Sequence, residues 1–237
     1  AVTDPLALGR EVILFESAGL GRSTGEVPES VPGMAAHALA FVDALGLTHA
    51  DLLGFSLGGM VAQQIALDRP SLVRKMLLVA TAPEGGEDIM HMDKPELKRI
   101  TDDPNLQGFQ VLVRLFFAPS KSSQAAGDAF AARLSKRKVD REPVSGPNVA
   151  KAQIAAFRAW EHFSGERFSK LGKIGQQCLV VNGIFDNMIP VRNSYMLSEN
   201  LPNAMLLTYP DAGHGSLFQF HDSFVKQASL FLDSESD

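Results

Sequence analysis

The sequence predicts an α/β fold, in which a mostly parallel sheet carries helices on both faces and a helical segment is inserted between two strands. Short apolar runs alternate with stretches of helical periodicity, which is typical of a parallel sheet with helical crossovers. Between residues 83 and 173 this alternation stops, and only helical patterns follow one another between Gly/Pro-rich joints. We therefore expect a core of residues 1–82 and 174–237 and a helical cap of residues 83–173.

The amino-acid composition excludes or disfavours several classes of function. The 237 residues are 45% hydrophobic and 21% charged, which excludes wholesale disorder. A net charge of −5, with only a short basic cluster at residues 136–138, disfavours nucleic-acid binding. No apolar run approaches the about 18 residues of a membrane span, so no membrane partner is expected. The single Cys excludes a disulfide framework and a Cys-rich metal site, and it is compatible with the cytoplasmic location that we expect by default.

The first half of the core is expected to contain three strands and two helices. Gly46 directly follows the first helical pattern and predicts its C-cap, and Pro70 follows the end of the second. In chain order the elements are a buried strand at Glu11–Phe15, a Gly/Ser-rich loop at Ser17–Gly25, a helix at Val31–Leu45, a strand at Ala50–Phe55, a helix at Leu57–Leu67 and a strand at Val73–Ala80.

The remainder contains the cap and the second half of the core. Within the cap, helical patterns lie near Pro95–Ile100, Phe109–Phe117, Gln124–Arg137 and Val149–Phe163. After the cap we expect strands at Gln177–Val181 and Ala204–Tyr209, a helix between them near Asn193–Glu199, and an amphipathic helix at Phe220–Leu232. Cys178 lies inside a predicted strand and is expected to be an inert, buried thiol.

The motif that carries chemistry lies between the strand at Ala50–Phe55 and the helix that follows. Residues 54–59 read GFSLGG, a G-x-S-x-G pattern centred on Ser56. This position, after a strand and before a helix, is the one that a nucleophile elbow requires. Such a turn is strained, so we expect the flanking glycines to be needed because a Cβ would clash. The N–H of Leu57, at the helix N-terminus, is the expected first oxyanion donor.

A nucleophilic serine needs a base and an acid that orients it. Of the six histidines, His214 lies between two glycines just after a predicted strand, whereas the others are expected to be structural. Asp186 follows the preceding strand and is the expected acid, with Asp211 as a rival three residues before His214. The chain order Ser, Asp, His is the order found with this elbow, and all three follow strands, where ligands bind in open α/β sheets.

These segments resemble the α/β-hydrolase fold family. The resemblance rests on the GFSLGG elbow, the VNGIFDNMIP acid loop and the AGHGS histidine loop, and it covers nearly all of residues 10–237. The segment FESAGLGRS also resembles a family loop, with Glu16 in place of the usual Asp. The resemblance implies a serine hydrolase in which residues 83–173 are the variable cap.

The sequence departs from the family pattern at its start. Family members carry one to three further strands before the one matching Glu11–Phe15, and the last of them leads into a His-Gly loop that supplies the second oxyanion N–H. Without them, either Glu11–Phe15 pairs directly with Ala50–Phe55, or a missing or separate N-terminal segment fills the slot. We expect a truncated form of a longer hydrolase, the alternative being a short variant with a rebuilt oxyanion hole.

The expected substrate is a small or medium, largely apolar ester, lactone or thioester, processed through an acyl-enzyme by Ser56, His214 and Asp186. Aromatic residues of the cap favour an apolar pocket, for which Phe55, Phe116 and Trp160 are weaker candidates. No metal or organic cofactor is implied, and the sequence does not indicate an oligomeric state. Two alternatives stay open: C–C bond hydrolysis, perhydrolysis or lyase chemistry on the same triad, and a ligand-binding protein without turnover. A dehalogenase is disfavoured because that chemistry places Asp at the Ser56 position.

Overall fold

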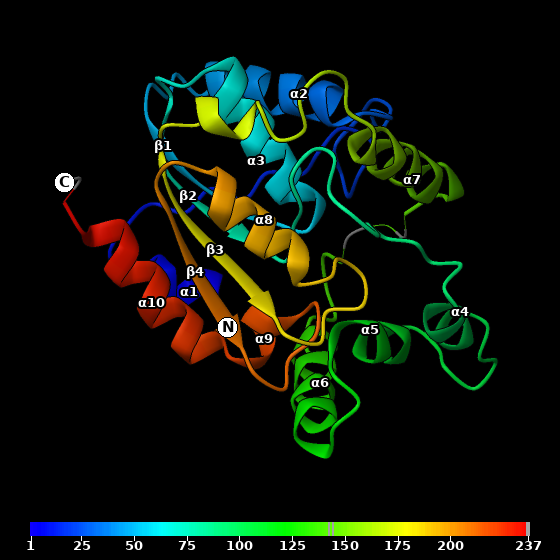
Figure 1. The fold of residues 1–237 in the computed structure, drawn as a ribbon. Helices are drawn as coiled ribbons and strands as arrows, with labels where there is room; N and C mark the ends of the chain where they lie inside the picture. The colour runs from blue at the N-terminus through cyan, green and yellow to red at the C-terminus, as the bar shows by residue number, and fades with distance from the viewer. Residues whose placement is uncertain (142, 144, 236–237) are drawn as a thin grey trace.

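The core of the protein is a four-stranded parallel sheet with the strand order β1-β2-β3-β4, as the computed structural model shows for residues 1–141, 143 and 145–235 (Figure 1). The strands agree with four of the five predicted and differ by at most two residues at their ends. They are β1 (Ala50–Phe55), β2 (Val73–Val79), β3 (Gln177–Gly183) and β4 (Ala204–Tyr209). Because all pairs are parallel, the carboxyl ends of the four strands meet at one edge of the sheet.

Helices cover both faces of this sheet, as predicted. Those of the core are α1 (Thr3–Leu6), α2 (Val31–Ala44), α3 (Leu57–Asp68), α8 (Arg192–Asn200), α9 (Ser216–Gln219) and α10 (His221–Asp233). Gly46 follows α2 with a φ of 67°, a left-handed conformation that suits the glycine predicted to end this helix.

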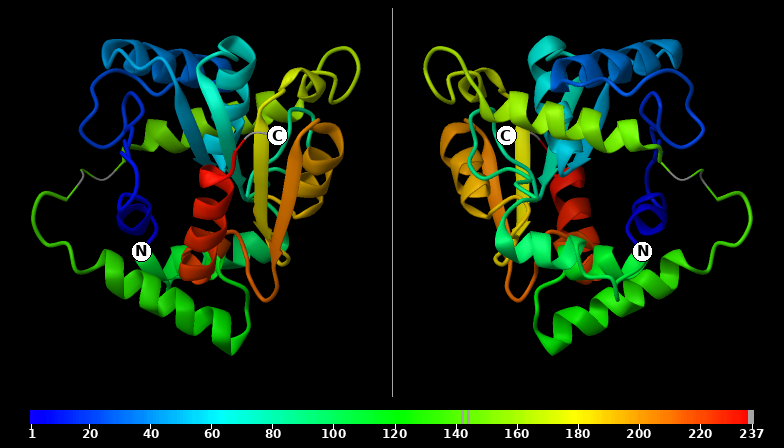
Figure 2. Two further views of the ribbon diagram at one scale, coloured as in Figure 1. Left: turned by 90° about the vertical axis from the view of Figure 1, so that its left-hand side faces the viewer. Right: turned by 90° about the vertical axis from the view of Figure 1, so that its right-hand side faces the viewer.

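The alternation of side chains along β2 sorts the helices into two layers. Met76 and Leu78 point into a core with α2, α3 and α8, whereas Leu77 and Val79 point into a second core with α1, α9 and α10. Successive residues of a strand face opposite sides of the sheet, so each face needs its own helical cover. Figure 2 shows α10 and α1 on the side of the sheet away from α2 and α3.

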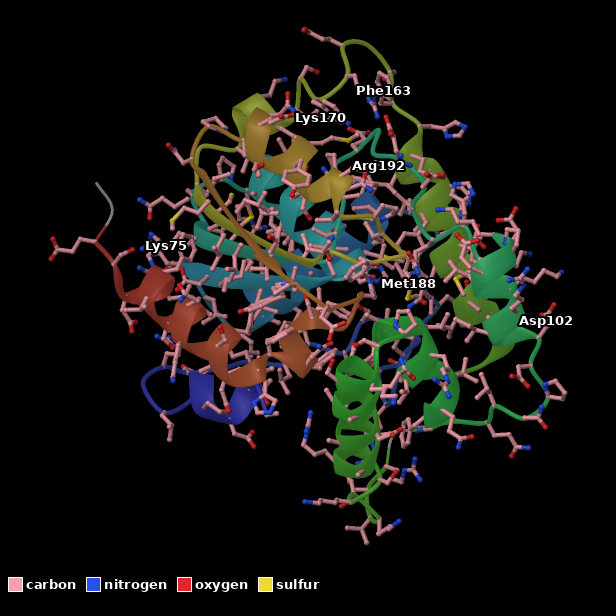
Figure 3. The ribbon with its side chains drawn as sticks, turned by 60° about the horizontal axis from the view of Figure 1, so that its bottom comes forward. Lys75, Asp102, Phe163, Lys170, Met188 and Arg192 are labelled. Carbon is pink, nitrogen blue, oxygen red and sulfur yellow. The ribbon has the colours of Figure 1, made fainter. Side chains whose placement is uncertain are left out.

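A buried lysine fixes α10 to the sheet. Lys75 of β2 is fully buried, and its ammonium donates hydrogen bonds to the carbonyl oxygens of Phe231 at 2.8 Å and Ser234 at 2.6 Å. Cations are stabilising at a helix C-terminus, where carbonyl groups lack intrahelical partners. Lys75 therefore anchors the end of α10 in the core (Figure 3).

The segment between β2 and β3 is helical, as predicted. It contains α4 (Pro95–Thr101), α5 (Phe109–Phe116), α6 (Lys121–Leu134), α7 (Pro147–Glu161) and a 3₁₀ turn at Leu171–Lys173, and its described residues include no strand. In Figure 1 the β3 arrow points toward α5 and α9, so α5 and α6 lie near the edge where the strands end. α5 and α6 are thus close to the loops that carry the candidate site.

The prediction of a strand at Glu11–Phe15 was wrong. These residues form no strand, and Leu14 is 72% exposed. The segment is held at its ends by helices instead: Arg10 bonds to Asp233 at 2.6 Å, and the rings of Phe15 and Phe41 are 4.9 Å apart. The segment thus runs between α10 and α2. Among the described residues, β2 is the one strand paired with β1.

In the loop after this segment, Glu16 has a structural role. Its carboxylate accepts a hydrogen bond from the Arg22 N–H at 3.1 Å, and its carbonyl accepts one from the Ser23 hydroxyl at 2.8 Å. Gly21 has a φ of 55°, and a Cβ there would lie 2.4 Å from the Glu16 carboxylate. The glycine pattern of this loop therefore lets the chain fold back onto Glu16.

Candidate active site

The turn between β1 and α3 holds Ser56 in a strained conformation. Its φ of 56° and ψ of −122° are unfavourable for a residue with a Cβ, and such strain persists only where the surroundings enforce it. The Ser56 N–H donates to the Val79 carbonyl at 2.8 Å, which ties the turn to β2. The Ser56 hydroxyl makes no capping bond to α3, so it is not occupied by the helix that it precedes.

Two of the three glycines in this motif are sterically required. A Cβ at Gly54 would lie 2.4 Å from the Gly58 carbonyl oxygen, and a Cβ at Gly59 would lie 2.6 Å from the Thr81 side chain. A Cβ at Gly58 would meet nothing within 4 Å. The expectation that every flanking glycine avoids a clash is therefore correct for Gly54 and Gly59 and wrong for Gly58.

Leu57 is the first residue of α3. The first N–H groups of a helix have no intrahelical acceptor and lie at the positive end of its dipole. This N–H follows Ser56 directly, at the edge where the strands end. Its position suits a donor to an oxygen that gains negative charge next to the Ser56 hydroxyl.

Asp186 lies in the loop after β3 and is held by the backbone around it. One carboxylate oxygen accepts hydrogen bonds from the N–H groups of Met188 and Ile189, both at 2.9 Å. The side chain is fully buried. Met188 marks this loop in Figure 3, where the sheet meets the inserted helices.

The second oxygen of Asp186 binds His214. The distance from His214 Nδ1 to Asp186 Oδ2 is 2.8 Å, and both side chains are buried. Pairing through Nδ1 leaves Nε2 as the ring nitrogen that can accept a proton from a hydroxyl group. The His214 ring also lies 4.9 Å from the ring of Phe55, the neighbour of Ser56, so the imidazole is next to the elbow.

Asp211, the rival acid, has other partners. Its carboxylate accepts a hydrogen bond from the Ser122 hydroxyl at 2.5 Å. Hydrogen bonds from Ser120 and Ser122 hold the pKa of Asp211 below its ordinary value. His214 is therefore paired with Asp186, whereas Asp211 is hydrogen-bonded to the inserted segment.

The three candidate pocket residues differ in their surroundings. The ring of Phe55 contacts those of Phe116, at 5.9 Å, and of His214. Phe218 of α9, which the sequence analysis did not single out, completes this aromatic group at 5.4 Å from Phe55.

Trp160 is a core residue. It is 4% exposed, and its Nε1–H donates to the Ala82 carbonyl at 3.1 Å. It belongs to a buried cluster with Met34 of α2 and Met60 of α3. Trp160 thus packs α7 against the core, although the sequence placed it among the weaker pocket candidates.

Close backbone packing between the acid and histidine loops also escaped the sequence analysis. A Cβ at Gly183 would lie 2.3 Å from the carbonyl oxygens of both Ala212 and Gly213, and the Phe185 N–H donates to the Ala212 carbonyl at 2.8 Å. The sequence offers one sign of this contact, which is the glycine of the Asn182-Gly183 pair at the end of β3.

Comparisons with known proteins agree with this architecture. A family model described as alpha/beta hydrolase fold matches residues 2–220. An alpha/beta hydrolase fold protein from Chitinophaga pinensis has a similar structure, with a TM-score of 0.89, 36% identity, and coverage of 99% of this chain and 83% of that one.

Two curated relatives are enzymes. A 2-hydroxy-6-oxo-6-phenylhexa-2,4-dienoate hydrolase from Burkholderia cepacia is 26% identical over 96% of this chain and 78% of its own. A pimeloyl-[acyl-carrier protein] methyl ester esterase from Pectobacterium atrosepticum is 28% identical over 93% of this chain and 83% of its own.

Among the described residues, no helix is both long and apolar enough to cross a lipid bilayer.

Proposed function

The chain belongs to the α/β hydrolase fold family and is a hydrolase, and from this premise we propose that it cleaves carboxylic esters, lactones or thioesters through a Ser56-His214-Asp186 triad. The observation that carries the proposal is the buried hydrogen bond between His214 and Asp186, at the same sheet edge as the strained Ser56. A hydroxyl, an imidazole and a carboxylate in this order form the minimal machinery of acyl transfer.

The mechanism follows from these positions. Ser56 Oγ attacks the acyl carbonyl carbon while His214 Nε2 takes the hydroxyl proton. Asp186 holds the imidazole through Nδ1 and stabilises the imidazolium that forms. The tetrahedral intermediate places its oxyanion near the Leu57 N–H. It collapses to an acyl-enzyme as His214 protonates the leaving group, and a water molecule activated by His214 then releases the acid.

The surroundings of His214 favour an apolar substrate of small or medium size. Rings of Phe55 and Phe116 lie 4.9 Å and 5.3 Å from the imidazole ring. Aromatic walls contribute binding energy to apolar groups, and they do not compensate the loss of solvent around a charged one.

The first experiment is intact-mass analysis with a fluorophosphonate probe, which reacts with activated serines. We expect one added phosphonyl group, mapped to Ser56. Ser56→Ala should remove labelling and lower ester turnover by about 10⁶-fold. Ser198→Ala, which changes a partly exposed serine on α8, should label like the unmodified protein. Ester hydrolysis that survives in Ser56→Ala would overturn the triad, and binding of esters without labelling or turnover would favour a ligand-binding protein.

C–C bond hydrolysis is a second candidate, favoured by the similarity to the dienoate hydrolase. The same three residues could serve it, because a serine alkoxide also adds to a ketone carbonyl. Product analysis separates the two candidates. Turnover of a vinylogous 1,5-diketone but not of p-nitrophenyl esters would assign C–C hydrolysis, and the reverse result would assign acyl ester chemistry.

A further inference from the structure

The backbone of the inserted segment approaches the histidine loop closely. The Gly215 N–H donates to the Phe116 carbonyl at 2.7 Å. A Cβ at Gly213 would lie 2.8 Å from that same carbonyl oxygen, and a Cβ at Gly215 would lie 3.0 Å from the Phe116 Cβ. The two glycines that flank His214 are thus the residues that let the end of α5 reach this loop.

Two side-chain contacts fasten the same loop on either side of His214. Before it, Asp211 accepts a hydrogen bond from Ser122 at 2.5 Å. After it, the Gln219 side chain accepts one from Ser123 at 2.7 Å and donates to the Asp211 carbonyl at 2.8 Å. Both serines lie in the first turn of α6, so α6 holds the loop at two points.

The ring of Phe116 completes the contact. Its centroid lies 5.3 Å from that of the His214 imidazole, and the ring planes make an angle of 68°. This edge-to-face arrangement restricts rotation of the imidazole about its own axis. Asp186 fixes Nδ1 alone, whereas the direction of Nε2 also depends on the position of the loop backbone.

We propose that the inserted segment positions the catalytic base. Three of its residues form what we call the histidine clamp: Phe116, Ser122 and Ser123. The clamp touches no reacting atom and acts through His214, holding its Nε2 toward Ser56. The inference rests on the proposed function, and it gives the insertion a role in the chemical step.

Gly213→Ala tests the clamp at its tightest point, with Gly175→Ala as the matched control because a Cβ there meets nothing within 4 Å. A displacement of about 1 Å in a catalytic group can lower the rate about 10²-fold. We expect Gly213→Ala to lower kcat for a p-nitrophenyl ester by about that factor with KM unchanged, whereas Gly175→Ala should leave both unchanged. A rise in KM alone would overturn the proposal.

Proton NMR provides a readout that does not need activity. The proton between His214 Nδ1 and Asp186 should give a strongly deshielded signal, retained in Gly175→Ala and broadened or lost in Gly213→Ala. If the unmodified protein fails to react with a fluorophosphonate, the proposed function fails, and this signal still decides the clamp. An unchanged signal in Gly213→Ala would overturn the clamp.

Ser122→Ala is the milder variant, because it removes one hydrogen bond and adds no atoms. We expect kcat to fall roughly two- to tenfold, the range of one hydrogen bond, with KM and the thermal midpoint close to those of the unmodified protein. Ser198→Ala again serves as the control. If Gly213→Ala does not fold, Ser122→Ala decides the question: unchanged kcat together with an unchanged deshielded signal would overturn the clamp.

Discussion

The two halves of the candidate site are supported in different ways. Asp186 and His214 follow β3 and β4, lie in the interior, and are held by backbone contacts between their loops. Ser56 follows β1, which lies at the edge of the sheet and whose Leu53 is 42% exposed. The acid and base are therefore fixed by their surroundings, whereas the nucleophile is fixed by a strained turn and its bond to β2.

This difference shows where each half is vulnerable. Close backbone packing tolerates no added atom, so the acid–base half should fail through small steric changes. The elbow depends on Gly54 and Gly59, and it has open space at Gly58. Exchange of glycine for alanine should thus be severe at Gly183, Gly54 and Gly59 and mild at Gly58.

The largest effect is expected from exchanging the acid. Asp186→Asn keeps the shape of the side chain but removes the charge that stabilises the imidazolium, and it favours the wrong tautomer of His214. We expect kcat for a p-nitrophenyl ester to fall about 10⁴-fold.

Asp211→Asn is the matched control, since it makes the same change three residues before the base. It keeps an acceptor for Ser122, so we expect a loss within about tenfold. Equal losses in steady-state kinetics for the two variants would contradict the assignment of Asp186 as the acid.

The next effect compares a single added methyl group at Gly183 and at Gly58, the open position of the elbow. Gly183→Ala would place a Cβ 2.3 Å from two backbone oxygens that cannot move aside, and we expect it to lower the free energy of unfolding by more than about 3 kcal/mol. Gly58→Ala adds the same atom to open space in α3, where Ala is favoured over Gly, so stability should be unchanged or raised by up to about 1 kcal/mol.

Urea unfolding followed by circular dichroism measures both values. A destabilised Gly58→Ala protein or an unaffected Gly183→Ala protein would contradict the packing described for these two positions. Gly175→Ala, with no neighbour within 4 Å of its Cβ, controls for the general effect of the exchange.

Features of this structure that depend on neighbouring residues could be predicted from the sequence. The turns at Ser56 and Gly46 could be predicted because each follows from a few neighbouring residues. The pairing of His214 with Asp186 could be predicted because both follow parallel strands, whose ends meet at one edge.

Features that depend on distant partners could not be predicted. Glu11–Phe15 has the apolar composition of a strand, but its ends are held by α10 and α2. The core position of Trp160 depends on its bond to Ala82, across the inserted segment. The role of Gly213 depends on the Phe116 backbone, which is far away in the chain.

The smallest effect concerns Cys178, which reports on the burial of β3. Burial raises the pKa of its thiol to about 12, so at neutral pH the reactive thiolate is nearly absent from the folded protein. We expect no labelling by a maleimide at pH 7.5 until urea unfolds the chain. Leu53→Cys, at the exposed position of the edge strand β1, should label at once in the folded state.

The same thiol links stability to alkaline pH. The folded protein holds this proton more tightly than the unfolded chain does. The protonated thiol therefore contributes to the free energy of unfolding, and this contribution is fully present below the pKa of the unfolded thiol, near 9. It is then lost as the pH rises toward about 12. Cys178→Ala, which does not titrate, should therefore lose less stability than the unmodified protein between about pH 9 and 11, as measured by urea unfolding. Parallel losses in the two proteins would mean that the thiol is less buried than the rest of β3, and the contrast with β1 would then be weaker than the packing indicates.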